Sequence, residues 1–192
     1  LTLAIALPLG LPIALGSNCR IRPLAWLCRL YVLIFRGTPL MLQLFFFYFF
    51  FPLVLKIKIS VFVTVILTFV LNYAAYLAEI YRGGINSVDK GQHEAAFALG
   101  LTKKQTMLDI ILPQTMKAVL PPIVNEAITL VKDTSLANVI AVAELFRAAK
   151  NEASRTASVE PLFVAGLFYL LMNGAVSFVF GCLNRRMAYY KD

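Results

Sequence analysis

The sequence predicts an all-α integral membrane protein with five transmembrane helices and one large polar loop between the third and fourth. Of its 192 residues, 60% are hydrophobic and only 15% are charged, too few to cover a soluble domain of this size. The apolar residues fall in runs near the roughly 20 residues that a membrane crossing needs. Basic residues, which give a net charge of +8, flank these runs. The positive-inside rule explains that arrangement without a nucleic-acid partner.

We expect a single transmembrane domain over residues 1–192, with spans at 1–16, 24–54, 60–81, 119–142 and 161–183. In the first, the basic residues follow the apolar run, which favours a trimmed span over a signal peptide. The second is overlong and contains "FRGTP". Pro39 lacks an amide donor and Gly37 loosens the turn, so a break is predicted near 36–39. The front part then becomes an angled or interfacial helix, and "LMLQLFFFYFFFPLVL" the crossing.

The distribution of cations predicts the orientation. One side would hold the basic residues within 20–29, 82–117 and 185–191, and the other the fewer within 56–58 and 147–155. The richer side is cytoplasmic by the positive-inside rule. The N-terminus is therefore expected outside and the C-terminus inside, with residues 82–118 as the largest cytoplasmic loop.

No catalytic or metal site is expected. Cys19, Cys28 and Cys182 lack CxxC spacing and are interpreted as small apolar residues. The one histidine, His93, lies in the polar loop, away from any thiol or carboxylate at metal-ligand spacing. A nucleophile within the spans would therefore have no histidine base.

The sequence of the polar loop predicts two short helices joined at a glycine. Ser87 is the expected N-cap of the first helix, with Asp89 in its first turn, and Gly100 suits the left-handed residue that ends it. Thr102 and Gln105 form a capping box for the second helix, which should stop near the proline at 113. Its apolar residues should share one face, namely Met107, Leu108, Ile111 and Leu112. Such a pair is either a connector on the membrane surface or a knob for a groove on a soluble partner.

One long motif separates those two interpretations. The loop reads Glu94-Ala95-Ala96, three residues, Gly100, nine residues, then Ile110-Ile111-Leu112-Pro113. This pattern resembles the complete EAA motif of ABC-importer permeases. "FRGTPL", "NYAAYLAEIYRGGI" and "NEAITLVKDTSLANVIAVAELFRAA" are similar to the polar amino-acid branch, of histidine, arginine or glutamine type. The resemblance covers almost the whole chain. It departs at Asp89 and His93, where the family often has a proline and an aromatic residue.

The resemblance implies a type I importer fold and a set of partners. In that family the loop is a coupling helix that docks on a separate ATPase subunit, two per complex. The chain has no G-x-x-x-x-G-K-[ST] motif, so it is not expected to be an enzyme, and ATP and Mg would be bound by the ATPase. The expected coupling residues are Glu94 for polar contact, Ala95 and Ala96 for close approach, Gly100 for the bend, and Leu101, Leu112 and Pro113. Other implied partners are a second or homologous permease, an extracytoplasmic solute-binding protein, a polar amino acid and membrane lipid, in a bacterial or archaeal cytoplasmic membrane.

Two stripes of polar residues inside the spans suggest a substrate path. Thr64, Thr68, Asn72, Tyr76 and Glu79 recur on one face of the third span. In the fourth span Glu126, Thr129 and Asp133 share a face, with Asn125 and Lys132 beside it. Such stripes either line a translocation path or hold helices together. The path candidates are Asn72, Tyr76, Glu79, Asn125, Glu126, Thr129 and Asp133, although Glu79 could instead pair with Arg82.

Two further questions stay open at this level. The polar segment 144–160 could be an external helix that meets the binding protein or an ordinary solvated loop. A different class of function, an ion-gradient transporter or channel subunit, would use Glu79, Glu126 and Asp133 as relays. Such proteins are expected to show two repeated halves, which the sequence lacks. The particular amino acid is open, with a slight preference for a basic one.

Overall fold

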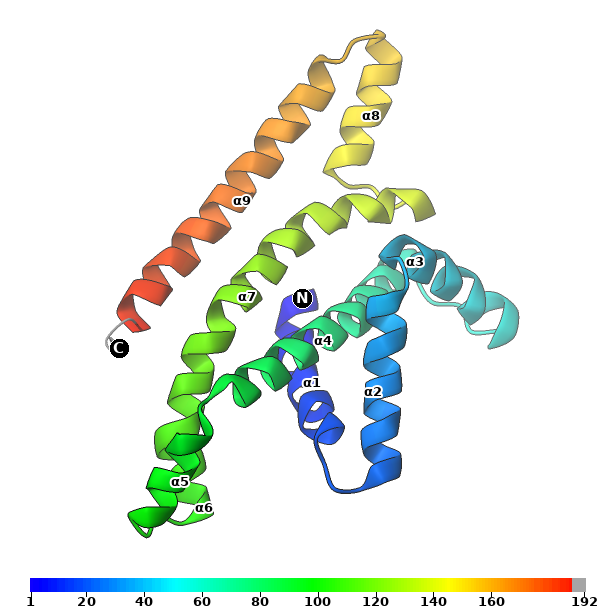
Figure 1. Cartoon of the computed structure of the whole chain (residues 1–192). Coiled ribbons are helices and arrows are strands. Elements are labelled where there is room, and N and C mark those ends of the chain that lie inside the picture. Colours follow the sequence, from blue (N-terminus) through cyan, green and yellow to red (C-terminus); the bar gives the residue numbers. More distant parts are fainter. Residues whose placement is uncertain (188–192) are drawn as a thin grey trace.

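The computed structural model describes residues 1–187, with side chains as far as residue 182, so the predicted C-terminal cation Lys191 lies outside the described residues. The described chain is helical from end to end, with helices joined by turns (Figure 1). In order these are α1 (Thr2–Ser17), α2 (Arg22–Gly37), α3 (Leu40–Phe49) with the π-helical η1 (Phe50–Val54), α4 (Val61–Ser87), α5 (Lys90–Ala98), α6 (Lys103–Gln105), the π-helical η2 (Thr106–Ile111), α7 (Leu112–Asp133), the 3-10 helix η3 (Thr134–Ile140), α8 (Leu145–Thr156) and α9 (Glu160–Met187).

Helix α4 forms the centre of the molecule. Ala6, Gly10 and Ala14 of α1 recur every four residues, and a Cβ on Gly10 would lie 3.2 Å from the Ala74 carbonyl oxygen of α4. Small residues at this spacing let two helix backbones approach closely in a membrane. A second cluster joins Leu44 of α3 and Phe69 of α4 to the chain after α7. The outer faces of α3 and α9 carry exposed large apolar side chains, as expected for lipid contact.

The predicted count of five spans is not confirmed. Within the described residues, three helices are long and apolar enough to cross a membrane, and a fourth crossing results if α2 and α3 with η1 count as one bent span. The helix α1 has 16 residues, about 24 Å at 1.5 Å per residue, against a hydrocarbon core of about 30 Å. The first predicted span, 1–16, is therefore found among the shorter apolar helices rather than among these three.

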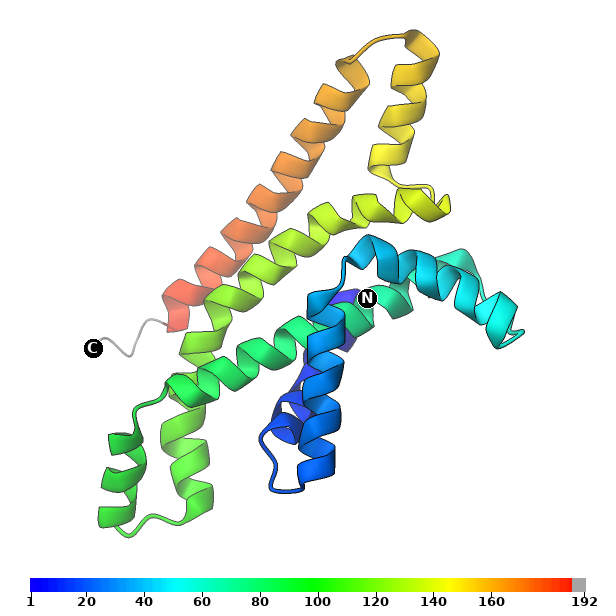
Figure 2. The same ribbon diagram turned by 45° about the vertical axis from the view of Figure 1, so that its right-hand side comes forward.

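The predicted break in the second span is confirmed. α2 and α3 meet at an angle of 107°, which forms the corner seen in Figure 2. Thr38 and Pro39 both have extended backbone. A proline disfavours helical backbone in the residue before it, so α2 must end there.

The long helices α4 and α7 extend into the predicted loop 82–118 from both sides. α4 continues to Ser87, and the chain is helical again from Lys103 through Ile140. The prediction that a helix stops near Pro113 was wrong for a specific reason. η2 precedes the proline, and the Leu112 N–H already bonds the carbonyl of Met107, five residues back. The proline's missing N–H therefore falls where the four-residue ladder is already interrupted.

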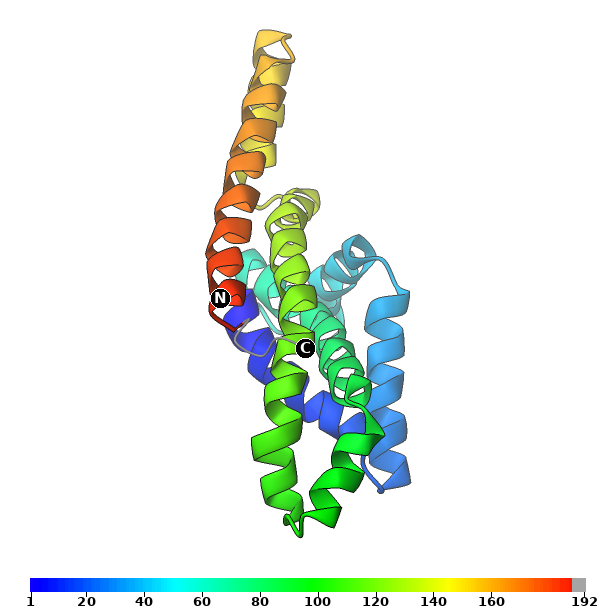
Figure 3. The same cartoon turned by 60° about the vertical axis from the view of Figure 1, so that its left-hand side comes forward.

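The two ends of the molecule carry different elements. The short helices α5 and α6 lie at one end, together with the turn between α1 and α2 (Figures 1 and 3). The helix α8 lies at the opposite end, which places the 144–160 segment away from the loop. Of the two alternatives left open for that segment, the helix is present, since α8 spans Leu145–Thr156.

Candidate functional site

A polar cavity lies where α2, α4 and α7 meet. Its volume is about 410 Å³. Five of the seven residues predicted for a substrate path line it: Asn72, Tyr76, Glu126, Thr129 and Asp133. The chain around the α2–α3 break supplies the facing wall, from Arg36 to Leu40. The helical periodicity of the two stripes therefore corresponds to two faces that converge on one cavity.

The amide of Asn72 helps to hold the break between α2 and α3. Pro39 has no N–H to bond the Phe35 carbonyl four residues earlier. Instead the Phe35 carbonyl accepts from Asn72 Nδ2 at 3.1 Å and from Gln43 Nε2 at 2.9 Å. Asn72 Nδ2 also donates to Gln43 Oε1 at 2.9 Å. The helix-joining alternative thus describes what the Asn72 side-chain amide does in this structure, although the residue also borders the cavity.

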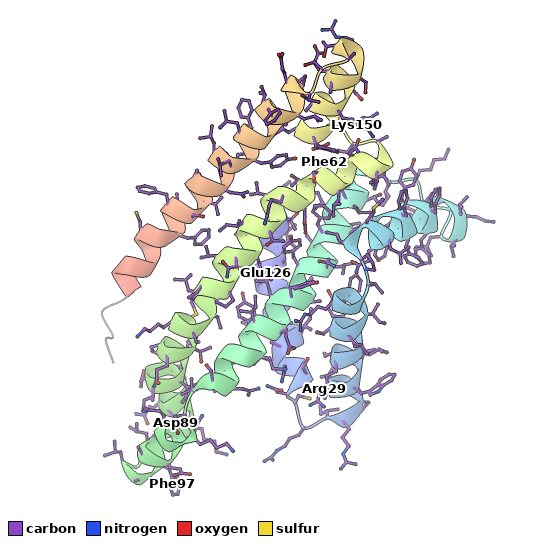
Figure 4. The ribbon with its side chains drawn as sticks, turned by 45° about the horizontal axis from the view of Figure 1, so that its top comes forward. Arg29, Phe62, Asp89, Phe97, Glu126 and Lys150 are labelled. Carbon is purple, nitrogen blue, oxygen red and sulfur yellow. The ribbon has the colours of Figure 1, made fainter. Side chains whose placement is uncertain are left out.

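Carboxylates occupy the α7 wall of the cavity. Tyr73 donates its hydroxyl to Asp133 Oδ2 at 2.8 Å, which joins α4 to α7. Glu126 lies two turns earlier on α7, about midway along the helix in Figure 4. Charged groups inside a membrane protein are costly and usually face a cavity or a partner. The two acids of α7, with the hydroxyl of Tyr73 from α4 bound to one of them, therefore form a site suited to a cationic group.

A guanidinium occupies the opposite wall. Arg36 lies over the ring of Tyr76, 5.3 Å from the centroid, an arrangement stabilised by the ring quadrupole. Its Nη1 is 3.8 Å from Glu79 Oε1. The cavity thus presents a cation on α2 and two acids on α7. That pairing complements a zwitterion, which carries an ammonium and a carboxylate.

The remaining two path candidates lie elsewhere. Glu79 faces an adjoining hollow, where Arg82 binds it through both Nε, at 3.1 Å, and Nη2. The ion pair considered for Glu79 is therefore present. Asn125 is exposed and borders neither the cavity nor that hollow.

Sequence reasoning missed three residues that border or shape the cavity: Arg36, Thr38 and Tyr73. Arg36 and Thr38 belong to "FRGTP", which was interpreted as a helix break and as part of the family resemblance, but not as part of a site. Tyr73 follows Asn72 directly and so falls outside a stripe chosen at three- and four-residue spacing. An arginine within an apolar run was the available signal, because membrane spans rarely carry a charge without a use for it.

The loop folds as a helix, a glycine turn and a second helix. The N-cap of α5 is Asp89, which accepts from Gly91 N at 2.7 Å, so the predicted Ser87 cap was wrong. Ser87 instead ends α4, where its hydroxyl bonds the Gly84 carbonyl. An extended residue, Val88, separates the two helices. The predicted span ended where the sequence becomes polar, but α4 continues past that point, since polar residues can also be helical.

The predicted glycine turn is confirmed. Gly100 has φ +72, and the N–H of Leu101 bonds the Ala96 carbonyl at 3.0 Å while that of Gly100 bonds Phe97. These two backbone hydrogen bonds together form a Schellman motif. The predicted capping box of Thr102 and Gln105 is also present.

The tip of the loop carries apolar side chains that are exposed on the surface of the molecule. Phe97 and Leu99 are 85% and 76% exposed, and Phe97 lies at the far end of the molecule in Figure 4. A groove of about 350 Å³ beside them is lined by His93, Phe97, Leu101, Lys103, Thr106 and Met107. Glu94 and Ala95 are exposed, whereas Ala96 is buried. Of the four apolar residues expected on one face, Ile111 is buried and Met107, Leu108 and Leu112 are exposed.

The chain is similar to known membrane transport proteins over almost its whole length. Residues 6–189 match the family described as binding-protein-dependent transport system inner membrane component. The arginine transport system permease protein ArtQ of Bacillus subtilis (strain 168) is 40% identical over 184 residues, covering 95% of this chain and 84% of that protein. The L-cystine transport system permease protein TcyB of the same organism is 38% identical over 186 residues, covering 95% and 78%.

Solved structures agree. A crystal structure of an amino acid ABC transporter with histidines superposes with a TM-score of 0.88 at 34% identity, covering 96% of this chain and 86% of that one. The methionine ABC transporter MetNI in an inward-facing conformation gives a TM-score of 0.75 at 17% identity, covering 97% and 87%, and shows the fold alone.

Proposed function

The chain belongs to the family of binding-protein-dependent transport system inner membrane components and is the permease subunit of an amino-acid ABC importer; from this premise, we propose that it moves polar amino acids into the cytoplasm by alternating access. Its single transmembrane domain works as a dimer with a second copy or a homologous permease. A solute-binding protein delivers the substrate, and two ATPase subunits drive the cycle. ATP and Mg are held by those ATPases rather than by this chain.

The charge arrangement of the cavity is the observation that carries the proposal. Arg36 on α2 and the acids Glu126 and Asp133 on α7 line one cavity of about 410 Å³. A free amino acid can place its carboxylate at the guanidinium and its ammonium at the acids. An excess of acids over cations in the lining also favours a substrate with a basic side chain.

The loop supports coupling to the ATPases. Its apolar tip, with exposed Phe97 and Leu99, and its exposed Glu94 form a small knob at one end of the molecule. A knob of this kind fits the helix-in-groove mode of recognition. We assign the coupling contact to Glu94, Ala95 and Leu101 at the knob, with Ala96 and Gly100 shaping it and Leu112 and Pro113 at its junction with α7. This end is cytoplasmic, and α8 at the opposite end faces the binding protein.

An ion-gradient transporter is the alternative, with Glu79, Glu126 and Asp133 as relays. The side chain of Glu79 is bound by Arg82 and lies near Arg36, and Asp133 accepts from Tyr73. Carboxylates engaged in this way favour fixed structural or substrate-binding roles over proton relay.

Uptake into proteoliposomes tests the proposal. The chain is reconstituted with its ATPase and binding protein, and uptake is measured for a panel of basic, acidic and amide amino acids. We expect uptake to need ATP on the side of the membrane that carries the ATPases, and to continue when an uncoupler is added. The KM for uptake should rise in Glu126→Gln and Asp133→Asn. Asn125→Ala, on the exposed face of the same helix, should leave the KM unchanged. Uptake that stops with the uncoupler while ATP is present would favour the ion-gradient alternative.

A further inference from the structure

A second, larger hollow adjoins the cavity on the side of the loop. Its volume is about 750 Å³, and it shares Arg36, Gly37 and Tyr76 with the cavity. From there it extends along α2 past Arg29 and along α4 past Glu79 and Arg82. In Figure 4, Arg29 lies on the half of α2 nearer to its start, and that start points to the same end of the molecule as α5 (Figures 1 and 2). The hollow is therefore a continuation of the cavity toward the loop end.

The charges that line the hollow do not cancel. Three arginines and one carboxylate border it. Glu79 is bound by Arg82 through two nitrogens and has Arg36 Nη1 at 3.8 Å. Arg29 donates from Nε to the Ser17 carbonyl at 3.0 Å. Within the described part of the chain, no carboxylate lies at ion-pair distance from the Arg29 guanidinium. The hollow thus carries an excess of two positive charges.

The arginines of α2 form a regular row. Arg22, Arg29 and Arg36 are seven residues apart, so they drift by only about 20° per step around the helix and share one face. Successive members are separated by about 10 Å along the axis. Charged groups in a membrane protein usually face a cavity or a partner, and two members of the row, Arg29 and Arg36, border the hollow. The row therefore brings positive charge from the loop end of α2 to the cavity, where an anion can use it.

We propose that this row is the exit track for the substrate's carboxylate, with Arg29 and Arg82 forming a second binding station between the cavity and the cytoplasm. The inference rests on the proposed function and assigns it a direction. In the cavity the substrate is held at both ends, by Arg36 and by the acids of α7. In the hollow Glu79 is already bound by Arg82 and the net charge is positive. The carboxylate is therefore attracted more than the ammonium, and the substrate moves on with its carboxylate leading.

Maximal uptake in Arg29→Gln tests the proposal. The variant is reconstituted with the ATPase and binding protein in vesicles of phosphatidylcholine alone and of phosphatidylcholine with phosphatidylglycerol. The probe is the panel amino acid with the highest wild-type uptake. We expect maximal uptake to fall about tenfold, as for loss of one hydrogen bond to a charged group, with the KM within about twofold because entry precedes this station. Arg29→Lys, which keeps the charge, should retain most of the uptake.

Arg20→Gln is the matched control. Arg20 lies on the turn at the same end of the molecule and does not border the hollow, so uptake should equal wild type in both vesicles. The double variant Glu79→Gln, Arg82→Gln removes one charge of each sign and should also lower maximal uptake.

Four results would overturn the assignment. Unchanged maximal uptake in Arg29→Gln would do so directly, and equal losses in Arg29→Lys and Arg29→Gln would show that Arg29 serves only its bond to Ser17. A loss confined to vesicles with phosphatidylglycerol would show that a lipid headgroup occupies the hollow. Absence of ATP-driven amino-acid uptake in the wild type would refute the proposed function itself, and this inference with it.

Discussion

The crossing of α4 and α7 depends on the absence of a side chain at Gly84. A Cβ built there would overlap Cγ1 of Val119, and it would lie 3.5 Å from Cγ2 of Thr115. The neighbouring Gly83 offers a matched control, because a Cβ there meets nothing within 4 Å. The two glycines follow one another on the same helix, just before α4 ends and the loop begins.

Replacing each by alanine separates helix propensity from packing. Alanine stabilises a helix interior by about 1 kcal/mol relative to glycine at either position. Forcing an extra methyl group into a closely packed contact costs about 1–3 kcal/mol. Gly84→Ala should therefore be less stable than Gly83→Ala by that packing cost. At roughly 2–4 °C per kcal/mol for a chain of this size, the melting temperatures should differ by roughly 2–12 °C.

Thermal unfolding of the purified protein in detergent, followed by circular dichroism, measures the difference. Adding Val119→Ala to Gly84→Ala removes the overlapping methyl group, so the two changes should couple favourably by about 1–2 kcal/mol. ATP-driven uptake should fall in Gly84→Ala and recover in the double variant, because the same contact seats α7 at the loop. Equal melting temperatures for Gly84→Ala and Gly83→Ala would refute the reasoning.

Two more predictions concern the loop and the cavity. Gly100→Ala forces a side chain into a left-handed residue at a cost of about 1–2 kcal/mol, and Glu94→Lys reverses the charge on the exposed knob; both should abolish ATP-driven uptake while membrane insertion stays normal, and ATPase coupling at the wild-type level in either variant would contradict the assignment. Tyr73→Phe removes the donor to Asp133 and should cost about 0.5–1.7 kcal/mol of stability and raise the uptake KM. Its control is Tyr31→Phe, which removes a bond to the Leu71 carbonyl at 2.5 Å outside the cavity and should change stability without changing KM.

The limits of sequence reasoning are clearest at the helix ends. Hydropathy indicates which residues can face lipid, and it located the apolar part of each long helix. It does not indicate where the helix stops, since charged residues such as Arg82 and Lys117 continue a helix as readily as apolar ones. Pro113 was interpreted as a stop because the π-helical turn before it has no simple sequence signature.

Two of the three walls of the cavity could be predicted from the sequence, and the third could not. Periodicity identified the polar faces of α4 and α7, which do converge. It could not show that the α2–α3 corner forms the third wall, because that depends on a 107° bend fixed by contacts distant in sequence. The bond from Asn72 to the Phe35 carbonyl, 37 residues away, is one of these. Arg36 belongs to that corner, so the periodicity of the two stripes did not include it, and its one local signal was a charge within an apolar run.

The continuity of α7 links the loop to the cavity in physical terms. The helix runs without a break from the junction with the loop at Leu112 to Asp133 in the cavity, about 32 Å at 1.5 Å per residue. Its acids face Arg36, which belongs to a different helix. A tilt of α7 about the Gly84 contact would therefore change the separation between the acids and the guanidinium, and with it the fit to a zwitterion. If the loop is the point at which ATPase movement enters, α7 is the helix that joins that point directly to the acids of the cavity.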